Sequence, residues 1–233
     1  MTDIKINNLG VVATLALLLS LSFFSKADGQ LMVMPAKSTL VGQENKKVQL
    51  SNVGDKALYL NIDLVRIDNP GITPEQKTSL GNIPKPQLMA NPAKLTLGPG
   101  QKRDINLISL SSPDKETVYR LYVIPVSSIN IIGDEPKDKI EAPVSFGIGY
   151  GVIVYHLPEK SKQISSWNYS CTAAGMRLIS DGNVKVVLNE LNEIPKSKKE
   201  INEIKLFPNV SQLFSFKNLK GKVDGKPFEV NCQ

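Results

Sequence analysis

The chain has 233 residues, with 28 lysines and arginines against 22 aspartates and glutamates and a formal net charge of +6. The basic residues are spread along the chain and form no run interleaved with aromatic residues, which argues against a nucleic-acid-binding protein. A single histidine and two cysteines, without a CxxC motif, leave few ligands for a metal site.

Residues 1–27 have the pattern of a secretory signal peptide. Lys5 provides a charged start, Leu9–Phe24 is an apolar run, and Ser25-Lys26-Ala27 places small residues at the −3 and −1 positions of a cleavage site. The alternative is an uncleaved membrane anchor, for which the apolar run is short. No other segment is apolar enough to span a bilayer, so we expect an exported, soluble mature chain.

The next part of the chain, residues 28–158, reads as one strand after another. Its β-branched or alternating segments are separated by clusters of Gly, Pro and Asn, which are typical of turns. The expected strands are Leu31–Pro35, Lys47–Asn52, Ala57–Ile67, Lys94–Leu97, Arg103–Leu110, Glu116–Pro125 and Ala142–Leu157. This number of short strands predicts an immunoglobulin-like β-sandwich.

A polar break at Pro158–Lys162 predicts a domain boundary, followed by a smaller β-domain over residues 159–233. Its expected strands are Ile164–Tyr169, Met176–Ser180, Val184–Leu191, Ile201–Phe207, Gln212–Phe216 and Pro227–Val230. The predicted fold class is therefore all-β, with two sandwich domains.

Both cysteines, Cys171 and Cys232, fall in this second domain. Because an exported chain meets an oxidising compartment, the default for an even count is a disulfide. It would close a loop of about 60 residues and contribute roughly 4 kcal/mol in the chain-entropy model.

The segment Val144–Tyr155 has the most regular pattern in the chain. Large apolar residues alternate with serine or glycine, so a strand here carries one apolar row on one face. The row consists of Val144, Phe146, Ile148, Tyr150, Val152 and Val154. Glycine in a strand often marks a place where another backbone comes close. The segment is either an ordinary core strand or a strand whose apolar row is lent to another protein by edge addition.

Three segments, in this order, resemble the periplasmic chaperones of the chaperone–usher pilus pathway. Leu88–Gln101 contains Asn91-Pro92 and Leu97-Gly98-Pro99-Gly100, similar to a Pro-…-Pro-Gly segment of that family. Pro113–Pro125, which includes Val118-Tyr119-Arg120, is similar to its strand F1. The alternating segment followed by Tyr155-His156-Leu157-Pro158 is similar to its strand G1 and the hinge to the second domain.

The resemblance implies a boomerang-shaped chaperone of the bacterial periplasm, without catalysis or cofactor. Such a chaperone completes an incomplete pilin (a fimbrial building block) with its own G1 strand and delivers it to an outer-membrane usher. The donor side chains then fall on Val144, Phe146, Ile148, Tyr150 and Val152. A self-dimer that covers this row is a further partner that the resemblance allows.

Family members anchor the pilin's terminal carboxylate with two basic residues, one on the first strand and one on G1. Here the G1 position is Ile153, and Leu31–Pro35 contains no basic residue. A divergent branch has a Tyr-Arg pair at the start of F1, which Tyr119-Arg120 resembles. Arg120 is therefore the candidate carboxylate anchor, and a surface cation is its alternative role. The lesser candidates are Lys37, Lys102 and Arg103.

Three other functions compete with this interpretation. An enzyme is disfavoured because no nucleophile elbow, HExxH motif or phosphate loop is present, and the lone His156 lies beside the hinge proline. A copper-binding sandwich would use the soft ligands Met32, Met34 and Met89, although methionine is more often core filler. A pilin or adhesin would need an apolar N-terminal extension, whereas Asp28-Gly29-Gln30 leads directly into a strand.

Overall fold

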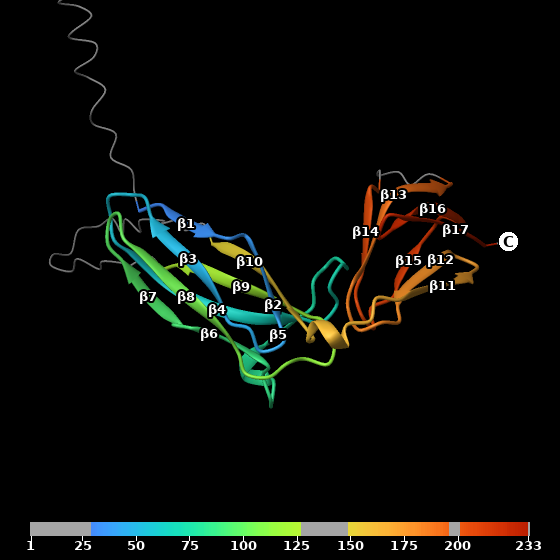
Figure 1. Cartoon of the computed structure of the whole chain (residues 1–233). Helices are drawn as coiled ribbons and strands as arrows, with labels where there is room; N and C mark the ends of the chain where they lie inside the picture. The colour runs from blue at the N-terminus through green and yellow to red at the C-terminus, as the bar shows by residue number, and fades with distance from the viewer. Residues whose placement is uncertain (1–28, 127–148, 196–200, 233) are drawn as a thin grey trace, which may run out of the picture.

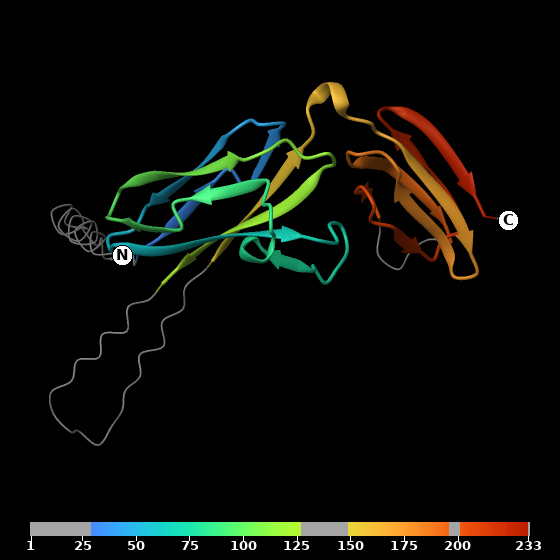
Figure 2. The same ribbon diagram turned by 90° about the horizontal axis from the view of Figure 1, so that it is seen from below.

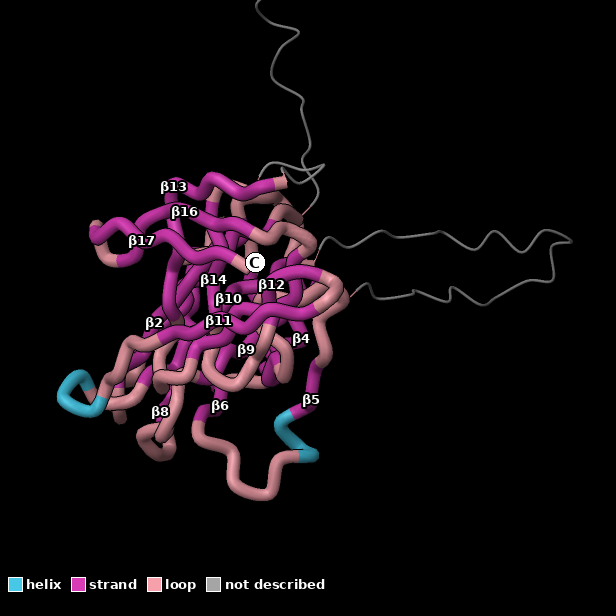
Figure 3. Tube along the Cα trace, turned by 90° about the vertical axis from the view of Figure 1, so that its right-hand side faces the viewer, coloured by secondary structure: helices cyan, strands magenta, loops and turns pink. Residues whose placement is uncertain are grey.

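The computed structural model describes residues 29–126, 149–195 and 201–232. Two β-sandwiches meet at an angle and give the molecule a boomerang shape (Figure 1). Strands dominate both sandwiches, and the helical segments described are the short 3-10 turns η2 (Leu80–Asn82) and η3 (Lys160–Lys162) (Figure 3). The prediction of an all-β, two-sandwich fold is confirmed.

The described ranges contain no helix that is long and apolar enough to cross a membrane. The predicted signal peptide, residues 1–27, lies outside these ranges and stays a prediction.

Two sheets form the first sandwich. The four-stranded sheet has the order β1 (Leu31–Met34), β3 (Lys46–Asn52), β8 (Lys102–Ser109) and β6 (Leu88–Asn91). The other sheet has the order β2 (Lys37–Val41), β10 (Tyr150–Leu157), β9 (Thr117–Pro125), β4 (Leu58–Ile67) and β5 (Lys77–Ser79), with β7 (Lys94–Leu97) also paired to β4. All neighbours run antiparallel except β2 and β10, which are parallel.

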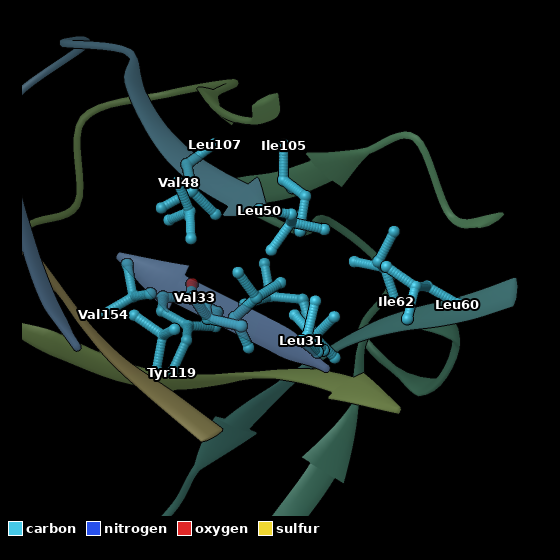
Figure 4. Close-up of a cluster of buried hydrophobic side chains, with 14 of the residues drawn as sticks. Leu31, Val33, Val48, Leu50, Leu60, Ile62, Ile105, Leu107, Tyr119 and Val154 are labelled. Carbon is cyan, nitrogen blue, oxygen red and sulfur yellow. The ribbon is translucent and has the colours of Figure 1, made fainter. Parts of the chain in front are cut away.

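The core of this sandwich follows from period-two alternation. In β4, Leu58, Leu60, Ile62 and Leu64 face inward while the residues between them are polar or exposed. Figure 4 shows how such inward side chains from both sheets interdigitate, among them Val48 and Leu107 facing Val154. Burial of these apolar rows is the main source of the sandwich's stability.

Three strands of the first sandwich, β2, β5 and β6, were not expected from the sequence. After β1, Pro35 and Ala36 interrupt the ladder, and the chain crosses to the other sheet as β2. Proline cannot donate to a ladder, so a break at this position is understandable. The pairing of β2 with β10 joins residues more than one hundred positions apart, which local pattern does not reveal.

The second sandwich packs a sheet of order β11 (Trp167–Thr172), β12 (Gly175–Ser180) and β15 (Gln212–Phe214) on a four-stranded sheet. The latter has the order β14 (Glu203–Leu206), β13 (Val186–Ile194), β16 (Asn218–Val223) and β17 (Lys226–Asn231). The expected disulfide Cys171–Cys232 is present and joins β11 of one sheet to the residue after β17 of the other. Strand β16 was not expected from the sequence.

A buried ion pair holds the two sandwiches together. The side chain of Glu116, just before β9, is fully buried and accepts hydrogen bonds from the backbone N (2.6 Å) and Nζ (2.8 Å) of Lys185. The Lys185 ammonium also lies 4.1 Å from the ring centroid of Tyr155 in β10. Beside it, Tyr155 stacks on Phe207 of the second sandwich with ring centroids 6.2 Å apart. These contacts fix the angle at which the domains meet.

His156 is fully buried at the end of β10. Its Nε2 lies 2.8 Å from the carbonyl oxygen of Gly42, which can only accept, so Nε2 carries the proton. Its Nδ1 is buried and has no partner within the described ranges. The residue is thus a neutral structural histidine, and burial lowers its pKa from the ordinary value of 6.5.

We expect Glu116→Ala to lower the free energy of unfolding by about 3 kcal/mol, because it leaves the Lys185 ammonium without its buried partner. The measurement is urea denaturation followed by tryptophan fluorescence, with small-angle scattering to detect a change in the interdomain angle. Glu229→Ala is the matched control, since Glu229 pairs with Lys220 on an exposed surface. A similar, small effect of both substitutions would contradict the role assigned to the ion pair.

We expect acidification to destabilise the protein through His156. Below about pH 6.5 the unfolded chain takes up a proton on this residue before the folded chain does. The free energy of unfolding therefore decreases as the pH is lowered. The contribution is at most about 1.4 kcal/mol per pH unit. Denaturation between pH 7.5 and 5 should show a shallower decline for His156→Gln than for the wild type, and equal slopes would exclude this histidine as the cause.

Candidate functional site

Strand β10 lies at the centre of the candidate site. Over one part of its length both of its edges pair with other strands, and over the rest only one edge does. From Ile153 to His156 it has β2 on one side and β9 on the other. From Tyr150 to Val152 it pairs with β9, and no described strand pairs with its opposite edge. The free edge therefore lies at the N-terminal end of β10, which residues 144–148 precede in the sequence.

The apolar row of β10 falls only partly within the described residues. Val144, Phe146 and Ile148 lie outside them, so their role as donor side chains stays a prediction. Tyr150 is partly buried against the core of the chain's own sandwich, and Val152 is 1% exposed within that core. The side chain of Val152 thus packs in its own domain, and its place in the donor row stays a prediction.

Gly151, the glycine of β10, makes room for a side chain. A Cβ on Gly151 would lie 3.4 Å from Cδ of Arg120, so the arginine side chain lies across the strand at this glycine. The sequence predicts the approach of a neighbouring backbone at these small residues. At Gly151 the structure instead shows the Arg120 side chain in the free space.

The opposite face of β10 forms part of the cleft between the two sandwiches. Ile153 on this face is in register with Arg120 of β9 on one side and with Lys37 of β2 on the other. Residues that oppose each other in neighbouring strands share a face, so two cations flank Ile153. Lys37 is far from this strand in the sequence, and only the crossing of the chain after Pro35 brings it beside β10.

Lys102 and Arg103, the other lesser anchor candidates, are not near this row. They begin β8, which belongs to the opposite sheet, and both side chains are exposed there. The structure therefore brings Arg120 and Lys37 to the cleft face and excludes Lys102 and Arg103 from it.

The Arg120 guanidinium has a carboxylate partner in the chain itself. Its Nε donates to Oε2 of Glu75 at 3.1 Å, and its Nη2 donates to Oε1 of the same residue. The hydrogen bonds from Arg120 hold the pKa of the Glu75 carboxyl below its usual range. Such a two-point contact is the geometry in which arginine binds carboxylates most strongly.

A cavity of about 220 Å³ opens beside this pair, between the sandwiches. Its lining combines the cations Arg120 and Lys205 with the apolar side chains of Ile153, Tyr155 and Phe207. Lys205 donates to Glu203 on its own strand. A site of this composition suits a carboxylate that carries an apolar group.

The three methionines considered for copper are not gathered into one site. Met32 and Met34 point outward from β1, whereas Met89 lies on β6 at the other edge of the same sheet. Strands β3 and β8 separate the two edges. Among the residues that the structure describes, no group of three or more His, Cys, Asp or Glu side chains could hold a metal ion.

The fold has close counterparts among solved structures. The class 5 fimbriae chaperone CfaA superposes with a TM-score of 0.65 at 22% identity, over 88% of this chain and 100% of that chain. A chaperone–tip adhesin complex of CFA/I fimbriae gives a TM-score of 0.67 at 24% identity, over 87% and 98% of the two chains. The chain has the fold of the fimbrial chaperones.

More distant members of this fold also match. The chaperone SafB of Salmonella enterica, in complex with the pilin SafA, gives a TM-score of 0.57 at 11% identity and covers 89% of this chain and 99% of that chain. In sequence, the chain is 29% identical over 183 residues to a CFA/I fimbrial subunit of Escherichia coli, which is 77% of this chain and 74% of that protein. No model of a known protein family matches the chain.

Proposed function

We propose that this protein is a periplasmic chaperone that binds pilins by donating a strand and passes them to an outer-membrane usher. The observation that carries the proposal is the pairing of β10, which has a strand on both sides from Ile153 to His156 but pairs only with β9 at Tyr150–Val152. An unpaired edge that leads into an alternating apolar segment is what strand addition requires.

The phase of the strand supports the predicted donor row. Tyr150, Val152 and Val154 share one face, and a period of two assigns Val144, Phe146 and Ile148 to the same face. Once the strand extends past its own sandwich, this row would fill the open core of an incomplete pilin. Each filled pocket would contribute roughly 1.5–3 kcal/mol, less the cost of ordering the partner.

The cleft supplies a second point of recognition in this proposal. Arg120, assisted by Lys37 across Ile153, would bind the terminal carboxylate of the pilin and thereby set the register of the added strand. Main-chain hydrogen bonds along the free edge would provide most of the affinity. Release would follow exchange of the donated strand for another pilin's own segment, without catalysis or ATP.

The proposal includes export and domain organisation. Residues 1–27 would be removed as a signal peptide, residues 28–158 would form the chaperone domain, and residues 159–233 would form the second domain. The CFA/I relative is named as a fimbrial subunit, so the experiments must separate a chaperone from a pilus component. A chaperone stays a soluble one-to-one partner, whereas a pilin on its own aggregates or polymerises.

We expect Phe146→Asp or Ile148→Asp to abolish capture of the pilin encoded in the same operon, because a charge cannot enter an apolar pocket. The measurement is co-purification from periplasm with C-terminally tagged chaperone. Ser145→Asp is the matched control, since the alternation assigns it to the opposite face of the strand. Normal capture by both row variants would refute strand donation.

We expect Arg120→Ala to weaken pilin capture at least about tenfold, because it removes the cation for a partly buried carboxylate. Lys37→Ala should weaken capture less. Lys102→Ala, on the opposite sheet, is the control and should bind normally. Titration of the purified chaperone with refolded pilin gives the dissociation constants, and equal constants for Arg120→Ala and Lys102→Ala would remove Arg120 from the anchor.

A further inference from the structure

The segment between β4 and β5, which we call the cleft loop (residues 68–76), is a self-contained unit. The backbone N of Asp68 donates to the carbonyl oxygen of Gln76 at 2.9 Å and closes the base of the loop. Asn69 spans the interior, since its Nδ2 donates to the carbonyl oxygen of Pro74 (2.9 Å) and its Oδ1 accepts from the backbone N of Gln76 (2.6 Å). Thr78 of β5 donates to the Asp68 carboxylate at 2.6 Å. The loop is thus preorganised without a ligand.

The cleft loop reaches from the first sandwich to the second. Figures 1 and 2 both show the connection between β4 and β5 extending toward β14 (Figure 1, Figure 2). A Cβ on Gly71, which has a φ of +86°, would lie 3.3 Å from the carbonyl oxygen of Lys205 and 3.4 Å from Cδ2 of Phe207. The loop therefore packs on the second sandwich at the edge of the cavity that Arg120 lines.

Glu75 extends from this loop onto Arg120 and contacts it with both carboxylate oxygens. Its side chain is 32% exposed and that of Arg120 is 22% exposed, so the pair lies at the mouth of the cavity. Lys77 adds a second cation 3.7 Å from Oε2 of Glu75. The carboxylate is thus presented to the guanidinium in the two-point geometry that a chain-terminal carboxylate would also use.

We propose that Glu75 is a built-in occupant of the carboxylate anchor, which a partner's terminal carboxylate must displace. This inference rests on the proposed function, since it takes Arg120 as the anchor. Exchange of one carboxylate for another leaves the number of charge-assisted hydrogen bonds at Arg120 unchanged. The anchor then contributes less affinity than an unoccupied arginine would, and it also sets register and selectivity. Small free carboxylates are kept out of the cleft, because they bring no strand pairing to offset the loss of Glu75.

The test uses a small carboxylate as the probe, so that strand addition plays no part. N-acetyl-leucine and its uncharged analogue N-acetyl-leucinamide are titrated into the purified mature protein, and the Nε–H signal of Arg120 is followed by NMR, with Arg120→Lys used to assign it. We expect Glu75→Gln to bind the acid about three- to tenfold more tightly than the wild type and to leave binding of the amide unchanged. Glu75→Asp, one methylene shorter, should give an intermediate constant.

Glu203→Gln is the matched control, because Glu203 is the carboxylate paired with Lys205 at the same cavity. Equal affinity of wild type and Glu75→Gln for the acid would overturn the role of Glu75 and leave the anchor standing. An equal gain from Glu203→Gln would also overturn it, since net charge would then explain the effect. If Glu75→Gln, shown by thermal melting to be folded, binds acid and amide alike, Arg120 is not a carboxylate anchor and the proposed function loses that part.

Discussion

The two-sided pairing of β10 is the constraint on which the other features depend. Between Ile153 and His156 the strand is held by β2 and β9, and its inward residues complete the core of the first sandwich. Its outward residues, Ile153 and Tyr155, line the cleft and contact the second sandwich. Toward Tyr150 the pairing becomes one-sided. One strand thus links the core, the cleft and the free edge, so the edge has a rigid base.

The joint between the sandwiches consists of specific polar and aromatic contacts. Glu116 and Lys185 are tied by two hydrogen bonds in a buried setting, and the Lys185 ammonium lies over the ring of Tyr155. An ion pair with a buried carboxylate contributes less to stability than its attraction alone would give, because desolvation of the carboxylate offsets that attraction. The arrangement it favours places Phe207 and Lys205 opposite Arg120 across the cavity.

In the proposed function, recognition at the cleft is a competition between carboxylates. In the free protein Arg120 is already satisfied by Glu75, and Lys205 by Glu203. A ligand that offers only a carboxylate therefore gains little. A ligand that also pairs with the free edge of β10 gains main-chain hydrogen bonds and apolar burial, which displacement of Glu75 does not cancel.

Local sequence determined most of the strands, the two sandwiches, the disulfide and the alternating row, because period-two burial and turn residues act over a few neighbouring positions. It also singled out Arg120. Only the tertiary structure decided that β2 crosses beside β10 and brings Lys37 next to Ile153, and that Val152 belongs to its own core. Only the tertiary structure showed that the Glu75 carboxylate is hydrogen-bonded to the Arg120 guanidinium. These relations depend on the register between distant strands and on the path of a loop. Because the packing of the whole chain sets both, they leave no periodic pattern in the sequence.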